Sequence, residues 1–70
     1  MYSKFGDIPV GAMFHAVNKA AGAVLSRKTP YRKTDTRVVM GHTVNASMAR
    51  RNRGDAFVLF ADDDMVEVVP

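Results

Sequence analysis

The stretch that decides the fold is AFVLFADDDMVEVV, residues 56–69. Its two ends, Ala56–Ala61 and Met65–Val69, are rich in Val and Phe, which favour β-strands. Between them, Asp62–Asp64 is a run of carboxylates that cannot be buried, and such a run is typical of a turn. Residues 56–69 therefore predict two strands joined as a hairpin.

Further strands are predicted upstream of this hairpin. Thr36–Met40 is β-branched and apolar, and Gly41 interrupts it. Thr43–Met48 then fits another strand, although Ala46–Arg51 would also fit a short helical turn. Both segments point to a chain dominated by short strands.

The segment between Gly11 and Gly22 permits two interpretations. Its apolar residues recur at helical spacing, but a glycine costs about 1 kcal/mol inside a helix, so both would have to lie at the ends. The same region fits two strands, Met13–Val17 and Ala23–Lys28, joined by a turn. We favour the hairpin and keep a short helix within residues 11–22, in an α+β fold, as the alternative.

Length and composition indicate one small domain, residues 1–70. A chain of this size has a thin core, since it buries only about 60% of its unfolded surface. It contains no Cys, so no disulfide can reinforce that core, and self-association into a homo-oligomer is one way to bury more apolar area. Short strands with frequent turns predict a mainly β protein, a curved antiparallel sheet closing into a barrel.

One segment resembles a known group of proteins. FGDIPVGAMF, residues 5–14, is similar to the opening of small phage and bacterial accessory proteins of SH3-like barrel type, where a Leu/Ile-Pro-Val-Gly-x-x-Phe motif precedes the first strand. Arg27–Thr29 resembles the basic end of their second strand, and Phe57–Val69 resembles their closing hairpin. The resemblance implies an SH3-like antiparallel barrel and a phage-like origin. Gly41–Arg53 departs from the compact pattern and is read as an elaborated loop.

The charges are sorted along the chain. Residues 27–53 hold eight of the ten Lys/Arg and one acid, Asp35, a balance of +7. Residues 54–70 hold five acids and no base, a balance of −5. This distribution places a positive surface beside a negative one and predicts a binding protein.

The positive block contains two clusters. RKTPYRKT, residues 27–34, places two Arg-Lys-Thr triplets around Pro30 and Tyr31, and we expect the tyrosine to be exposed between them. RRNRG, residues 50–54, is the second cluster. Arg and Lys neutralise phosphates, and an exposed tyrosine stacks on bases. The candidate binding residues are Arg27, Lys28, Tyr31, Arg32, Lys33, Arg50, Arg51 and Arg53.

Three functions remain open on these grounds. The first is a small phage-like accessory protein that binds nucleic acid through the basic rim. The second is a protein-binding modulator or inhibitor of a host protein, in which the acidic hairpin of residues 62–67 can mimic nucleic-acid charge. The third is self-assembly through opposite charges. Without any of these functions, the basic residues would simply form a solvated surface that discourages aggregation.

Catalysis, metal binding and cofactors find no support in the motifs. No nucleophile elbow or Walker-type phosphate loop is present, so we expect no enzyme and no cofactor. His15 and His42 lack partners at metal-ligand spacing, and the aspartates are better explained by a turn than by a cation site. The Phe and most Met residues are expected in the core. The longest apolar run has six residues, so we expect a soluble cytoplasmic protein, in the host cytoplasm if phage-encoded.

Overall fold

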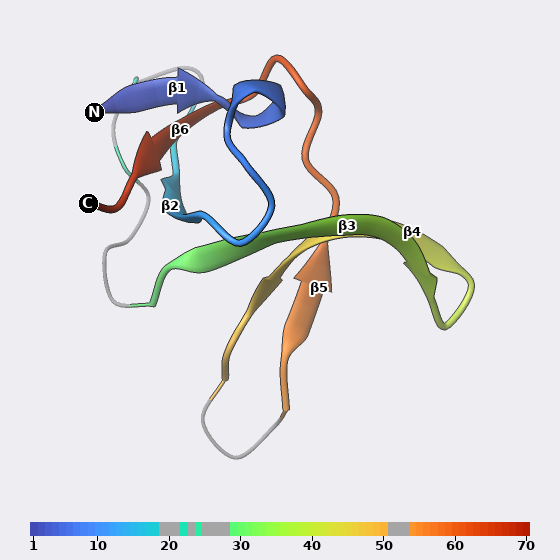
Figure 1. Cartoon of the computed structure of the whole chain (residues 1–70). Coiled ribbons are helices and arrows are strands. Elements are labelled where there is room, and N and C mark those ends of the chain that lie inside the picture. The colour runs from blue at the N-terminus through green and yellow to red at the C-terminus, as the bar shows by residue number, and fades with distance from the viewer. Residues whose placement is uncertain (19–21, 23, 25–28, 51–53) are drawn as a thin grey trace.

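In the computed structural model of the chain, the described residues form six β-strands and one short 3-10 helix (Figure 1). The structure describes residues 1–18, 22, 24, 29–50 and 54–70. In chain order the elements are β1 (Tyr2–Lys4), η1 (Phe5–Asp7), β2 (Met13–Ala16), β3 (Tyr31–Val39), β4 (His42–Met48), β5 (Ala56–Val58) and β6 (Met65–Val68). None of the described residues is in an α-helix, so the predicted mainly β class is confirmed.

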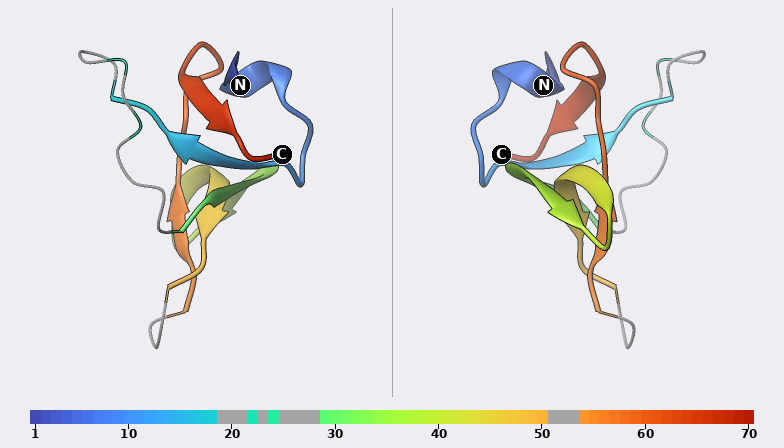
Figure 2. Two further views of the ribbon diagram at one scale, coloured as in Figure 1. Left: turned by 90° about the vertical axis from the view of Figure 1, so that its left-hand side faces the viewer. Right: turned by 90° about the vertical axis from the view of Figure 1, so that its right-hand side faces the viewer.

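The strands form one antiparallel sheet in the order β1-β6-β2-β3-β4-β5. β1 and β5 are its two ends, so the described sheet is open and does not close into the expected barrel. The curved antiparallel arrangement remains broadly consistent with the SH3-like type. Figure 2 shows that β4 and β5 extend away from the β1–β6 pair, beside which both chain termini lie.

Only the start of the favoured hairpin, Met13–Val17 with Ala23–Lys28, lies among the described residues. Met13–Ala16 is strand β2, and Val17 forms an antiparallel bridge with Val24. The described part of residues 11–22 contains no helix, so the α+β alternative is wrong for that part. The rest of the second predicted strand, residues 23–28, lies outside the described residues.

The β3–β4 hairpin is longer than the sequence predicted. Met40 and Gly41 form its two-residue turn, and both have positive φ angles, 51° and 82°. Such a turn matches the right-handed twist of paired strands, and glycine adopts its second position without strain. Within the predicted loop of residues 41–53, His42–Met48 forms strand β4. The helical turn that was the alternative for Ala46–Arg51 is therefore wrong for Ala46–Met48.

The predicted pairing of the two C-terminal strands is wrong. β5 pairs with β4, whereas β6 lies between β1 and β2. After β5 the chain separates from β4, because the Asn45 side chain bonds to the Phe60 backbone in place of a strand partner. The Asn45 Nδ2 donates to the Phe60 carbonyl at 2.9 Å, and its Oδ1 accepts from the Phe60 N–H at 2.8 Å. These two bonds end the β4–β5 ladder and turn Phe60 toward the core.

The acidic turn then directs β6 into its place. The Asp62 carbonyl accepts from the Gly6 N–H at 2.9 Å, and the Asp64 carbonyl accepts from the Phe5 N–H at 2.7 Å. Residues 62–64 form a turn, as predicted, but this turn contacts η1 and does not join a hairpin. A β-carbon on Gly6 would lie 2.9 Å from the Asp62 Cβ, so only glycine fits this contact without a shift.

Four aromatic rings dominate the core. Phe5, Phe14, Tyr31 and Phe60 have neighbouring ring centroids 5.2–5.6 Å apart, in stacked and edge-to-face arrangements. The core also includes Ile8, Val44, Ala46 and Val66, all buried. Three residues expected in the core are exposed instead: Phe57, Met40 and Met65.

Candidate functional site

Four of the eight predicted binding residues lie in the described part of the chain. These are Tyr31, Arg32 and Lys33 at the start of β3, and Arg50 after β4. The other four, Arg27, Lys28, Arg51 and Arg53, lie outside the described residues. The alternation of side chains along β3 separates the first three, because successive strand residues point to opposite faces of a sheet.

Lys33 points inward and is held by the backbone of the N-terminal segment. Its Nζ donates to the Phe5 carbonyl at 2.9 Å and to the Ile8 carbonyl at 2.7 Å. The same ammonium lies 4.6 Å from the centroid of the Phe5 ring, within the range of a cation–π contact. Lys33 therefore fastens η1 to β3, and its charge is satisfied inside the protein.

Tyr31 also points inward, which corrects its expected exposure. It pairs in register with Phe14 of β2, and the two rings stack at 5.6 Å. A second, edge-to-face contact joins it to Phe60 at 5.4 Å. The ring is thus partly buried and belongs to the edge of the core.

Arg32 lies between these two residues and points to the outer face of the sheet. It is exposed, and its guanidinium makes no hydrogen bond or ion pair with another described residue. Its cross-strand partners are Met13 on β2 and Ser47 on β4. Cross-strand partners in an antiparallel pair share a face, so these residues form one row across the outer face.

This row forms part of a surface hollow of about 440 Å³, which we call the Arg32 groove. Its lining residues are Met13, Thr29, Pro30, Arg32, Ser47, Ala49 and Asp55. Thr29 and Pro30 follow the first basic pair in the chain, and Ala49 and Asp55 flank the second cluster. The groove therefore brings together the described ends of the two basic clusters, which the sequence left apart.

Arg50 lies close to this groove. It is exposed, and its Nε donates to the Gly54 carbonyl at 3.4 Å, so the bond joins the two described ends of the second cluster. Arg50 lines a neighbouring hollow together with Asp55 and Phe57, and Asp55 lines the Arg32 groove as well. Asp55 is therefore an acidic residue that the two hollows share.

Phe57 is the residue of this face that the sequence did not identify. It pairs with Ser47, so it continues the row Met13–Arg32–Ser47 onto β5, and it is 43% exposed. Residues 56–60 are all apolar, so their pattern gave no indication of which side chains face outward. Exposure of Phe57 follows from the edge position of β5 and from the departure of the chain at Phe60.

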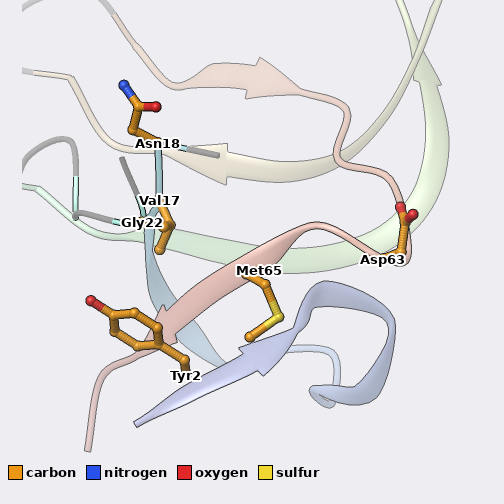
Figure 3. A pocket seen from close by; sticks show the side chains of 6 residues that line it. All are labelled: Tyr2, Val17, Asn18, Gly22, Asp63 and Met65. Atoms are coloured by element: carbon orange, nitrogen blue, oxygen red, sulfur yellow. The ribbon is translucent and has the colours of Figure 1, made fainter. Parts of the chain in front are cut away.

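A second pocket lies on the other half of the sheet (Figure 3). Tyr2 of β1, Met65 of β6 and Val17 after β2 line it, with Asp63 from the acidic turn. Its described lining has an acidic side chain and no basic one, so among the described residues nothing in it would attract a phosphate. The Arg32 groove is the better candidate for the predicted anionic ligand.

The described residues show neither a metal centre nor a membrane span. Their His, Asp and Glu residues form no group of three that could hold a metal ion. Within the same residues, no helix has the length and hydropathy needed to cross a bilayer. Comparisons of the chain with protein-family models, curated proteins and solved structures find no match.

Proposed function

We propose that this protein binds nucleic acid through the outer face of its sheet, at the Arg32 groove. The observation that carries the proposal is the position of Arg32. It lies exposed on the outer face, in a groove bordered by the segments that hold both basic clusters. Its guanidinium is available to a phosphate, whereas the ammonium of Lys33 is held internally.

The charge distribution supports the same ligand. Residues 27–53 carry a balance of +7, from eight bases and one acid. Among the described bases of this block, Arg32 lies in the groove and Arg50 lines the neighbouring hollow. Arg27, Lys28, Arg32, Arg50, Arg51 and Arg53 are the proposed phosphate contacts. Binding that depends on phosphate neutralisation releases counterions and therefore weakens steeply as the salt concentration rises.

The resemblance of residues 5–14 to small phage proteins supports an accessory role in a host cell. In this role the domain supplies affinity for nucleic acid and no catalysis of its own. The proposed location is accordingly the cytoplasm of the host.

The test is a salt titration of binding. A fluorescein-labelled 15-nucleotide oligo(dT) and a labelled 15-base-pair duplex are each titrated with protein at several KCl concentrations, and anisotropy gives the affinity. Replacing Arg50, Arg51 and Arg53 together by Gln should reduce the slope of log affinity against log salt by about 2 for the single strand. Arg37→Gln is the matched control, because Arg37 is an exposed base of β3 outside the groove and should leave the slope unchanged.

Binding of neither oligonucleotide would refute the proposal. The competing function, modulation of a host protein, has its own signature in a pull-down from host lysate. A single protein that remains bound after nuclease treatment indicates the modulator, and partners lost on nuclease treatment indicate nucleic acid.

A further inference from the structure

Phe57 is placed where an aromatic platform for a base is needed. The row Arg32–Ser47–Phe57 crosses three adjacent strands of the outer face in register. Neighbouring strands are about 4.8 Å apart, so Arg32 and Phe57 are separated by about 10 Å. A cation and an exposed aromatic ring therefore lie on one surface, with the hydroxyl of Ser47 between them.

The two aromatic residues have opposite surroundings. Tyr31, the expected stacking residue, is packed against Phe14 and Phe60. Phe57 is 43% exposed and takes part in none of the ring–ring contacts that build the core. An exposed phenyl ring on an edge strand contributes little to the core and is free to contact a ligand.

We propose that the ligand of this face is single-stranded nucleic acid, with a base stacked on Phe57 and the backbone phosphate near Arg32. This inference rests on the proposed function and specifies its ligand. In a duplex the base faces are already covered by neighbouring bases, so an aromatic side chain on a sheet can stack only on an unpaired base. The Phe57 ring is thus useful to a single strand and not to a duplex.

The charges of the face favour this ligand over an apolar protein surface. Arg32 supplies an exposed cation about 10 Å from the ring along the same row, and Arg50 supplies another in the hollow that Phe57 lines. Asp55 adds one acceptor that suits the amino group of a base and repels a phosphate. The combination of ring, cations and a single carboxylate matches a nucleotide, which offers a base face to the ring and a phosphate to the cations.

The experiment compares three labelled probes of equal length: oligo(dT)15, an abasic chain with the same number of phosphates, and a 15-base-pair duplex. The wild-type protein should bind oligo(dT)15 more tightly than the abasic chain. Phe57→Ala should weaken oligo(dT)15 binding roughly 5- to 150-fold, the range for loss of one stacked base. The same variant should bind the abasic chain and the duplex as the wild-type protein does.

Two further substitutions separate stacking from a change in folding. Phe57→Leu keeps an apolar side chain on β5 and should still lose the preference for bases, whereas Phe57→Trp should keep it. Because the chain has no other Trp, the fluorescence of Phe57→Trp should be quenched by oligo(dT)15 and not by the abasic chain. Val38→Ala, an exposed apolar residue on the β3–β4 hairpin, is the matched control and should bind like the wild-type protein.

The outcomes distinguish this inference from the proposed function. Equal affinity for oligo(dT)15 and the abasic chain, with no effect of Phe57→Ala, overturns the stacking role and leaves nucleic-acid binding intact. Unquenched Phe57→Trp fluorescence in a saturated complex overturns it as well. Failure to bind any of the three probes refutes both proposals.

Discussion

The inner and outer sides of β3 each carry a basic residue, and the two residues have different surroundings. Lys33 on the inner side is bound to two backbone carbonyls and joins η1 to the sheet. Arg32 on the outer side is exposed in a groove and bonds to none of the described side chains. Two adjacent bases thus have a structural role and a candidate binding role, and the direction of the side chain separates them.

The aromatic residues show the same division. Tyr31 shares the inner side with Lys33 and closes the ring cluster, whereas Phe57 lies in the row of Arg32 on the outer side. A tyrosine next to basic residues suggested a ligand contact, and a phenylalanine in an apolar strand suggested the core. The structure reverses both positions, which shows that local composition does not define a binding surface.

The sharpest test of the comparison is Lys33→Met. It should destabilise the protein by about 2–4 kcal/mol, because it removes two charge-assisted hydrogen bonds and leaves the buried Ile8 carbonyl without this donor. Methionine retains most of the apolar stem, so the loss reports the ammonium. Urea unfolding followed by circular dichroism measures the change, and a loss no larger than that of Arg32→Gln would contradict the structural role.

Gly6→Ala tests the close contact between η1 and the acidic turn. The new methyl group would meet the Asp62 Cβ at 2.9 Å and the Asp62 carbonyl at 3.1 Å, which displaces the acidic turn from η1. The expected cost is about 1–3 kcal/mol of unfolding free energy. Gly41→Ala makes a useful comparison, because a β-carbon there meets no atom and only its positive φ is strained. Equal behaviour of the two variants would rule out the contact as the cause.

Arg32→Gln tests the outer side. Its effect on unfolding should stay within about 0.5 kcal/mol, since the residue is exposed. Its effect on oligonucleotide binding should be a decrease of about 0.7 in the salt slope for a single strand. Anisotropy titrations at several salt concentrations measure this slope, and an unchanged slope would exclude Arg32 from phosphate contact.

The smallest expected effect belongs to Asp55→Asn. Asp55 lines both the Arg32 groove and the Arg50 hollow, so its carboxylate repels a phosphate bound there. Its neutralisation should tighten binding about two- to fivefold at low salt and less at high salt. Weaker binding by Asp55→Asn would mean that the carboxylate contacts a base directly. If the affinity fell only for oligonucleotides of one base, that base would be the one contacted.

The strands were the most predictable part of this protein. The Val- and Phe-rich segments at 56–61 and 65–69 contain β5 and β6, and the segments at 36–40 and 43–48 overlap β3 and β4. Their pairing was not predictable, because neighbours in the sequence need not be neighbours in a sheet. The bonds from Asn45 to Phe60 and from Gly6 to Asp62 decide it, and each joins residues at least 15 positions apart.

The site was predictable only in part, for a related reason. The basic segments and their charge balance are visible in the sequence, and Arg32 and Arg50 lie exposed as a binding role requires. Alternation along β3 divides Tyr31, Arg32 and Lys33 between two faces, and the sequence does not show which face is inward. Phe57 joined the site only once β5 was known to be an edge strand paired with β4.

The sequence by itself determined the strand-rich class, the separation of basic and acidic segments and the turn at Asp62–Asp64. These properties depend on local residue preferences and on charge, which do not require knowledge of distant contacts. The tertiary structure decided the strand order, the inward position of Lys33 and Tyr31, and the outward row that ends at Phe57. Those choices depend on long-range hydrogen bonds and on burial of the aromatic cluster, because together they fix which side of each strand faces water.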